Sequence, residues 1–548
     1  MWNQLRCRLN IVATASFLAT FLVACAAESA EPPNVLVVLF DDLGYSDLGC
    51  YGGEIPTPNI DGLSRGGLRF TRMTTSARCC PSRAALLTGL HPGQAGIPNF
   101  GGQLVDNCAT LAEVLKANGY STYAVGKWHV GHTPVERGFD EYYGFPAGHS
   151  RDQWRPNAYV RLPRDREPEI KVAENEFYAT DVFTEYALEF LDQAEAKQKP
   201  WFMYLAHSSP HFPLQAPIES TRSFVSTYRQ GWDKLRADRF MKMKQIGLIQ
   251  DHRWKLTERS LVPVESRNAI ANGYSGKPNP AWDELSSDLQ EDLAHRMAIY
   301  AAMVKHVDVG VGRIIDRLNV SGQLENTLVL ILSDNGACYE WGPLGFDDAS
   351  RKGITHLYRG ERLKQIGLAG TYISVGSAWA NLSNTPHRLY KHFTHEGGIL
   401  SPMVVHWPAG IQEPGRWVRD SAHLIDVMST VVDVTGASYP TMIRNAEVQP
   451  MEGVSLASLF TPGNSLAERT LCYQHSGARA IQSGDWKLVL GKRFPTTPKW
   501  ELYNIKDDPC ETVDLAPQNP ERVAIMTKQW EAWAKRTTAL APGNKPKG

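Results

Sequence analysis

Short apolar runs recur along the chain, and each ends in polar or glycine-rich sequence. Continuous β-type runs of this kind predict strands that are buried on both faces, as in a parallel sheet. They occupy residues 34–40, 121–125, 201–206, 327–332 and 402–407. The pattern therefore predicts five buried parallel strands spread over most of the chain.

A long helix is predicted between the third and fourth runs. Apolar side chains recur there every three or four residues, at Leu289, Leu293, Met297, Tyr300, Val304, Val307, Val311, Ile314 and Leu318. This spacing gives a helix one apolar face. Ser286 or Ser287 can cap its start, and Gly322 follows its end. Strands that alternate with helices indicate an α/β fold, a large and mainly parallel sheet flanked by helices, with ligands bound at the carboxyl ends of the strands.

The pattern changes after about Gly436. Short β-type runs and a helix-like tail predict a smaller α+β subdomain there, over residues 478–481, 486–490, 500–503 and 521–536. We therefore expect one large domain over residues 31–436 and a C-terminal subdomain over residues 437–548. Long segments at 145–170, 208–285 and 339–390 are expected to form loops over the strand ends, where loops choose the substrate.

The first residues have the pattern of an export signal. Arg6 and Arg8 precede an apolar stretch at 11–24, shorter than the roughly 20 residues of a membrane-spanning helix. Residues 1–25 are therefore interpreted as a secretory signal peptide. Residues 22–25, Leu-Val-Ala-Cys, also resemble a bacterial lipoprotein box, in which Cys25 carries a lipid anchor, and the other interpretation is cleavage after Ala26. We favour the lipoprotein, and both interpretations place the protein outside the cytoplasm: in the periplasm, anchored to the outer membrane, or secreted.

Composition and charge exclude several classes of protein. The 548 residues are 43% hydrophobic and 21% charged, which is typical of a globular protein. Lys plus Arg number 57 and Asp plus Glu number 58, so the net charge of -1 provides no general field for nucleic acid or an anionic membrane. Of nine cysteines, Cys7 and Cys25 belong to the signal. The remaining seven are scattered and odd in number, which does not fit a dense disulfide framework.

Polar side chains follow two of the predicted strands. Asp41 and Asp42 come after the first run, and Asp334 and Asn335 come after the fourth. Either pair alone would more often be a simple turn, but two pairs at matching strand ends predict a shared site. Carboxylate and amide oxygens suit a hard cation. We expect Ca²⁺, with Mg²⁺ second because it demands tighter geometry and retains more water.

Residues 79–89, Cys-Cys-Pro-Ser-Arg-Ala-Ala-Leu-Leu-Thr-Gly, form the most specific motif. Pro81 and the Ala-Leu-rich stretch after it predict the start of a helix, with Cys79 at its N-terminus. Unpaired N–H groups and the positive end of the helix dipole lower a cysteine's pKa there and hold an anion. The alternative is that Cys79 and Cys80 form a buried structural pair.

Cys-x-Pro-Ser-Arg followed by Ala-x-Leu-x-Thr-Gly resembles the signature of the formylglycine-dependent sulfatases, a family of the alkaline phosphatase superfamily. The resemblance spans nearly the whole chain after the signal, and its motifs follow the family order: Asp41-Asp42, the Cys79 segment, Gly126-Lys127-Trp128-His129, Pro210-His211, Asp334-Asn335-Gly336, and Lys391 before Glu396-Gly397-Gly398. Residues 484–489 and 500–503 resemble the family's C-terminal subdomain. The chain is arylsulfatase-like, which implies an alkaline-phosphatase-like fold with its catalytic domain over residues 31–436.

The resemblance also implies how the nucleophile arises. A maturation enzyme would oxidise Cys79 to formylglycine (3-oxoalanine), and the hydrated aldehyde would attack sulfur in line. It would also add a ligand at Cys79 to the metal held by Asp41, Asp42, Asp334 and Asn335. Arg83, one helical turn beyond Cys79, would hold the nucleophile beside that metal.

The resemblance also implies roles for four further residues in the hydrolysis of a sulfate ester. The substrate is an anion with a poor leaving group, so the site needs cations and a proton donor. By resemblance, Lys127 and Lys391 bind sulfuryl oxygens. Arg388, His392 and His395 lie near Lys391 and could take its role, and the spacing to Glu396 selects Lys391. His129 orients or deprotonates the hydrated aldehyde, and His211 protonates the leaving oxygen.

The resemblance implies a sulfuric ester hydrolase that converts a sulfated carbohydrate or an aryl sulfate to an alcohol and inorganic sulfate. Two alternatives remain: a phosphoester or phosphonate hydrolase of the same superfamily, and a non-catalytic protein that binds sulfated glycans because Cys79 is never oxidised. Residues 474–479 depart from the family's Glu-x-Glu-Gly-Asn-Arg-like segment. Loop aromatics before Lys391 could stack on a sugar or an aryl group, or simply pack the loop; they are Tyr339, Trp341, Tyr372 and Trp379.

Overall fold

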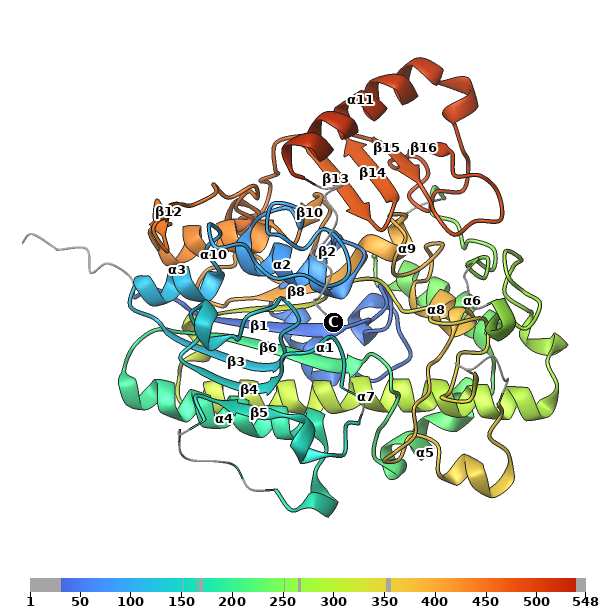
Figure 1. Ribbon diagram of the computed structural model, residues 1–548, viewed down its shortest axis with the longest axis horizontal. Helices are drawn as coiled ribbons and strands as arrows, with labels where there is room; N and C mark the ends of the chain where they lie inside the picture. The colour runs from blue at the N-terminus through green and yellow to red at the C-terminus, as the bar shows by residue number, and fades with distance from the viewer. Residues whose placement is uncertain are drawn as a thin grey trace, which may run out of the picture. The chain divides into compact units, whose positions relative to one another are not determined.

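A ten-stranded mixed sheet organises the fold (Figure 1). This computed structural model describes residues 31–538 except 151, 165, 167–169, 171, 251, 265–267 and 351–355. The predicted signal peptide and Cys25 lie outside the described residues. The strands of the large sheet are β1 (Asn34–Asp41), β2 (Leu68–Thr74), β3 (Ser121–Lys127), β4 (Glu141–Phe145), β5 (Val160–Leu162), β6 (Trp201–Pro210), β7 (Thr327–Ser333), β8 (Leu400–His406), β9 (Arg416–Val418) and β10 (Ala422–His423). Their order is β10-β2-β8-β7-β1-β6-β3-β4-β5, and β9 also pairs with β2.

The five predicted apolar runs all form strands of this sheet, namely β1, β3, β6, β7 and β8. The first four are parallel neighbours. The prediction was wrong for the direction of β8, which pairs antiparallel with β7 and with β2. A continuous apolar run reports burial on both faces, and β8 is buried along its whole length, but burial does not fix strand direction. The predicted α/β class, a large sheet flanked by helices, is confirmed.

Helices cover both faces of the large sheet (Figure 1). They are α1 (Pro58–Arg65), α2 (Cys79–Thr88), α3 (Leu111–Ala117), α4 (Ala179–Lys197), α5 (Ile218–Tyr228), α6 (Trp232–Gln245), α7 (Ser287–Val320), α8 (Ser377–Ser383), α9 (Glu396–Ile399) and α10 (Asp426–Thr435). Leu36 and Val38 of β1 pack in one cluster with α4 and α7, whereas Val35 and Val37 pack with α2, α3 and α10. Alternate residues of one strand therefore enter two separate apolar layers.

The long predicted helix is α7. Its N-cap is Ser286, and Gly322, just beyond its end, has a φ of 73°. Glycine adopts this left-handed conformation without strain, so the chain can turn sharply into β7. The described part of the chain has no helix that is both long and apolar enough to cross a membrane.

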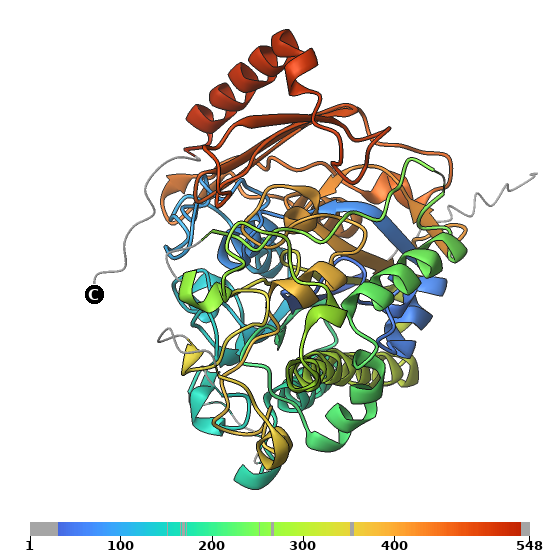
Figure 2. The same ribbon diagram turned by 90° about the vertical axis from the view of Figure 1, so that its right-hand side faces the viewer.

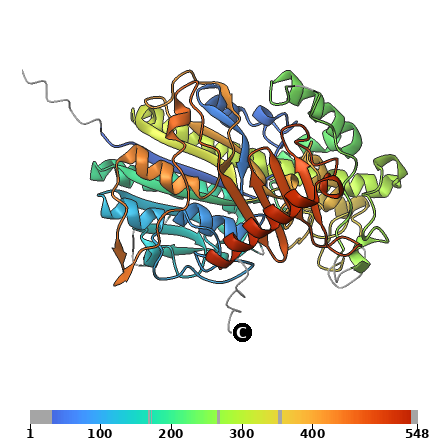
Figure 3. The same ribbon diagram turned by 90° about the horizontal axis from the view of Figure 1, so that it is seen from above.

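The C-terminal part forms a four-stranded antiparallel sheet covered by a helix (Figure 2). Its elements are β13 (Thr470–His475), β14 (Ala478–Ser483), β15 (Trp486–Leu490), β16 (Trp500–Asn504) and α11 (Pro520–Arg536), and a short hairpin of β11 (Met442–Ile443) and β12 (Ala446–Glu447) precedes them. Figure 3 shows α11 lying across the small sheet. The opposite face packs on Ala77 and Ile399, beside the start of α2 and the end of α9. The chain from Pro32 on is one compact unit, and a boundary at residue 436 stays a prediction.

Candidate active site

Four oxygen-bearing side chains meet at one edge of the large sheet. β1 ends at Asp41 and its parallel neighbour β7 ends at Ser333. The backbone N–H of Asp42 donates to Oδ1 of Asp334 at 3.3 Å, and Nδ2 of Asn335 donates to Oδ1 of Asp42 at 2.6 Å. Asp42 has a φ of 69°, a strained conformation of the kind that concentrates at functional sites. The strand ends thus form one buried group of polar side chains.

Arg83 reaches this group from α2. Its Nε and Nη2 donate to Oδ2 of Asp334 at 3.1 and 2.8 Å, and its Nη1 donates to the carbonyl of Lys127 at 3.0 Å. A planar guanidinium satisfies both partners at once, which an ammonium cannot do. Arg83 therefore ties α2 to the ends of β3 and β7.

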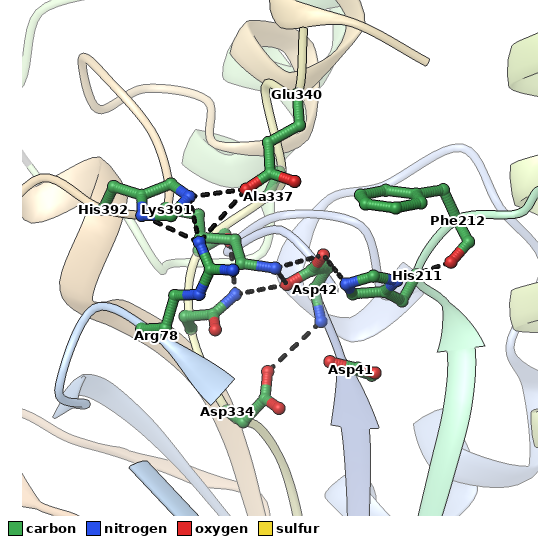
Figure 4. A network of polar contacts seen from close by, with 12 residues as sticks. Asp41, Asp42, Arg78, His211, Phe212, Asp334, Ala337, Glu340, Lys391 and His392 are labelled. Atoms are coloured by element: carbon green, nitrogen blue, oxygen red, sulfur yellow. Dashed lines mark hydrogen bonds and ion pairs between the residues drawn. The ribbon is translucent and has the colours of Figure 1, made fainter. Parts of the chain in front are cut away.

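Two lysines neutralise the other carboxylates. Nζ of Lys127, the last residue of β3, lies 2.6 Å from Oδ2 of Asp41. Nζ of Lys391 lies 2.8 Å from the Asp42 carboxylate, a contact shown in Figure 4. All four side chains are at most 1% exposed. Together with Arg83 and Asp334 the protein supplies equal numbers of positive and negative charges, so an added divalent cation leaves the site attractive to an anion.

The two facing aspartates differ in how tightly they bind a proton. Burial alone would raise the pKa of Asp41, but Lys127, His211 and Arg83 hold that pKa well below its usual value. Burial and the negative charge of Asp41 raise the pKa of Asp334 well above its usual value. Two carboxylates in one buried site favour a bound proton or a bound cation between them.

Two side-chain oxygens of the site accept no hydrogen bond from the described residues. They are Asp41 Oδ1 and Asn335 Oδ1, and both are buried. Buried polar atoms in proteins are nearly always bonded. With the carboxylates of Asp42 and Asp334 they make an all-oxygen donor set, which fits a hard cation such as Ca²⁺.

Cys79 lies where the sequence motif predicts it, at the first position of α2, after the extended N-cap residue Arg78. Its side chain is buried. A hydrogen bond from Cys80 and, against the effect of burial, the charge of Lys127 hold the pKa of the Cys79 thiol well below its usual value. The electropositive surroundings that favour a thiolate also favour an anionic nucleophile.

The two predicted histidines lie on either side of the site. Burial lowers the pKa of His129, which has a φ of 62° and a ligand atom within 4.8 Å of both Cys79 and Cys80. Nε2 of His211 lies 3.4 Å from Oδ2 of Asp42, and burial lowers its pKa. The ten side chains singled out from the sequence therefore surround one site.

Three neighbours of the site are not among the ten side chains singled out from the sequence. Arg78 precedes Cys79, His392 follows Lys391, and Glu340 comes from the loop after β7. Their chain positions beside two motif residues could have marked Arg78 and His392, but Glu340 belongs to no motif. Figure 4 shows the three in contact next to Lys391.

The loop aromatics before Lys391 mostly pack the loops. Trp379 is fully buried and crosses Trp232 edge-on, and Tyr372 packs in a cluster with Phe346. The aromatic ring most exposed among the described residues is instead Phe100, at 59%.

Comparisons with known proteins agree with this geometry. Residues 33–437 match the family model described as "Sulfatase", and residues 386–536 match the model described as "N-sulphoglucosamine sulphohydrolase, C-terminal". An uncharacterized sulfatase of Schizosaccharomyces pombe is 31% identical, over 93% of this chain and 95% of its own. An arylsulfatase of Klebsiella aerogenes is 31% identical, over 82% and 97%. The crystal structure of Ps i-CgsB, 24% identical, shares the fold with a TM-score of 0.63 over 94% of this chain and 96% of its own.

Proposed function

Because this chain belongs to the sulfatase family and is a sulfuric ester hydrolase, we propose that it cleaves sulfate monoesters with a formylglycine made from Cys79 and a calcium ion held by Asp41, Asp42, Asp334 and Asn335. The observation that carries the proposal is the pair of buried oxygens, Asp41 Oδ1 and Asn335 Oδ1, that accept no hydrogen bond from the described residues. The leaving alcohol is that of a sulfated carbohydrate or an aryl sulfate.

The donor set distinguishes between cations. Carboxylates and one amide oxygen are typical ligands of Ca²⁺ and Mg²⁺, and Mg²⁺ usually keeps several waters. The site is fully buried, so a cation that loses most of its water shell, such as Ca²⁺, fits better. When present, the cation and the hydrated aldehyde supply a hydroxyl of lowered pKa as nucleophile and draw charge from a sulfuryl oxygen.

The protein's own cations bind the sulfuryl group. Lys127 and Lys391 present buried ammonium groups on two sides of the strand ends, where charges act more strongly than in water. Arg83 fixes Asp334 and the end of β3 through three hydrogen bonds. These groups stabilise the charge that spreads over the sulfuryl oxygens in the transition state.

Proton transfer falls to the two histidines. Nδ1 of His211 lies 2.6 Å from the carbonyl oxygen of Phe212, which can only accept, so Nδ1 carries a hydrogen. The other nitrogen, Nε2, lies 3.4 Å from Oδ2 of Asp42. It delivers a proton to the leaving oxygen only when His211 is the imidazolium, with a hydrogen on both nitrogens. Burial keeps His129 neutral beside position 79, which leaves it able to accept a proton from the nucleophile.

Two further parts of the proposal concern the maturation and the export of the protein. A maturation enzyme would act on Cys79 within the motif of residues 79–89. The signal at residues 1–25 would export the chain, and Cys25 would anchor it through a lipid if the lipoprotein interpretation holds.

The test is the release of sulfate by matured protein. Wild type and Cys79→Ala are produced with a maturation enzyme and assayed on 4-nitrophenyl sulfate, 4-nitrophenyl phosphate and a phenylphosphonate ester. The proposal predicts that wild type prefers the sulfate and that Cys79→Ala is inactive. A preference for either phosphorus ester would favour the phosphoester or phosphonate hydrolase, and an inactive wild type would favour a glycan-binding protein.

A further inference from the structure

Three ionisable side chains adjoin the sulfuryl site without a role in the reaction proposed above. Nη1 of Arg78 lies 3.1 Å from Oε1 of Glu340 and 3.0 Å from Nδ1 of His392. Nε2 of His392 lies 2.6 Å from the same Glu340 oxygen. We call these three residues the Arg78 cluster, and Figure 4 shows it beside Lys391 and Asp42.

The backbone beside this cluster is strained at two positions. Ala77 and His392 have φ values of 59° and 77°, and neither residue is glycine. The N–H of His392 donates to the carbonyl of Ala77 at 2.8 Å. Such conformations persist only where the surroundings enforce them, and they concentrate at binding and catalytic sites.

Arg78 contacts Glu340 and His392 through Nη1. Nε of Arg78 is buried and has no hydrogen-bond partner in the part of the chain that the structure describes. The Arg78 side chain is nevertheless 15% exposed, so solvent and a ligand can reach it. A ligand that supplies an acceptor can therefore approach this side chain.

Phe100 lies beside the Arg78 cluster. The Arg78 guanidinium carbon lies 4.8 Å from the centre of the Phe100 ring, and that ring meets the ring of His129 edge-on at 5.6 Å. Phe100 is 59% exposed. An exposed ring that contacts a residue of the reaction site offers an apolar face to whatever carries the sulfate.

The charges in the cluster cancel. Burial alone would raise the pKa of Glu340, but Arg78 and His392 hold it well below its usual value, so Glu340 is a carboxylate. Burial and the nearby Arg78 charge lower the pKa of His392 to about 4, so it is neutral at pH 7. A second anionic group would gain little here, because the positive and negative charges are paired.

A hydroxyl group is the ligand that this arrangement suits. It donates to a carboxylate and accepts from a guanidinium, and neighbouring hydroxyls of a sugar can do both at once. The carbon face of a sugar ring can pack on an exposed aromatic ring. An aryl or steroid alcohol would use the ring of Phe100 but would offer no neighbouring hydroxyls to Arg78 and Glu340.

We propose that the Arg78 cluster and Phe100 bind the leaving group as a sugar, so that the substrate is the sulfate ester of a carbohydrate bearing free hydroxyls rather than an aryl or steroid sulfate. This inference rests on the proposed sulfatase reaction at Cys79. It makes Arg78, Glu340 and Phe100 determinants of specificity.

The test compares selectivity in matured protein. Wild type, Glu340→Gln and Phe100→Ala are assayed on 4-nitrophenyl sulfate, estrone sulfate and a panel of sulfated mono- and oligosaccharides of galactose, fucose and hexosamine. Peptide mass spectrometry first confirms equal aldehyde content at position 79. We expect wild type to show its highest kcat/KM on a carbohydrate sulfate.

In Glu340→Gln the ratio of sugar to aryl kcat/KM should fall at least about tenfold, because a hydrogen bond to a charged acceptor is lost. Removal of a negative charge cannot weaken the attraction of the site for an aryl sulfate anion. Phe100→Ala should raise KM for the sugar, and because its side chain is largely exposed the variant should fold. Matched controls are Glu501→Gln, a carboxylate paired with His395 at 3.3 Å, and Ile525→Ala, equally exposed at 59%; both should keep the wild-type ratio.

Two results would overturn this inference: equal losses on sugar and aryl sulfates in Glu340→Gln and Phe100→Ala, or a wild type that prefers an aryl or steroid sulfate to every sugar. A wild type with the aldehyde that cleaves neither class would instead contradict the proposed function itself.

Discussion

Substitution of Lys487 tests how the C-terminal sheet is attached to the catalytic part. Nζ of Lys487 on β15 lies 2.6 Å from Oε1 of Glu396 and 2.8 Å from Oε1 of Glu511. All three side chains are 0% exposed. Glu396 begins α9, just after the loop that carries Lys391. Lys487→Met removes the cation between two buried carboxylates, and Arg72 remains 3.3 Å from Glu396.

The size of the effect follows from the pKa of Glu396. Burial alone would raise it, but Lys487 and Arg72 lower it from 4.5 to about 2. A shift of this size corresponds to about 3 kcal/mol of stability at neutral pH. Since the folded pKa is lowered, this contribution is present above pH 4.5 and is lost as the pH falls towards about 2. Breaking a buried pair typically costs about 3–5 kcal/mol, so we expect Lys487→Met to lower the free energy of unfolding by that amount.

Urea unfolding at pH 7, followed by tryptophan fluorescence, measures the loss. The matched control is Lys499→Met, which removes a pair with Asp514 at 3.4 Å on the same small sheet, where the side chains are 70% and 24% exposed. That exposed pair should contribute less than about 1 kcal/mol. The double variant Lys487→Met, Glu396→Gln should be more stable than Lys487→Met, because it removes one unpaired charge. Equal losses in Lys487→Met and Lys499→Met would refute the reasoning.

Three further predictions concern the reaction. Arg83→Lys removes the guanidinium that donates two hydrogen bonds to Asp334, so kcat on 4-nitrophenyl sulfate should fall about 100-fold or more. A loss below threefold would contradict the role of Arg83. His211→Gln should slow alkyl sulfates about 100-fold and 4-nitrophenyl sulfate far less, because 4-nitrophenolate leaves without a proton; equal losses would mean that His211 is not the acid. A calcium chelator should abolish sulfate release, Ca²⁺ should restore it better than Mg²⁺, and Asp334→Asn should bind Ca²⁺ more weakly in calorimetry. Equal rescue by Mg²⁺ would contradict the assignment of the cation.

The sequence predicted those elements in which burial and periodicity act together. β1, β3, β6 and β7 are buried along nearly their whole length, and α7 keeps its apolar spacing over 34 residues. β2 escaped prediction because its register with β8 shifts between Phe70 and Met73, which breaks the alternation of apolar residues. The direction of β8 depends on how the chain returns to the sheet, and no local pattern records that.

The residues of the site also fall into two groups, those that the sequence could predict and those that it could not. Asp41, Cys79 and Lys127 stand in contiguous motifs at the ends of predicted elements, so their convergence could be expected from the sheet. Glu340 and Phe100 come from loops without periodicity, and their positions depend on contacts between segments far apart in the chain. The residues proposed to bind the leaving group are therefore those that could be identified only from the structure.

The most direct test of the central claim is the mass of the peptide that contains Cys79, measured alongside sulfate release in the same preparations. Protein is made with increasing amounts of a maturation enzyme, and the fraction of aldehyde at position 79 is compared with kcat on 4-nitrophenyl sulfate. We predict that activity rises in proportion to the aldehyde and vanishes when position 79 remains a thiol. Sulfate release by protein in which Cys79 is wholly unmodified would contradict the claim that the aldehyde is the source of the nucleophile.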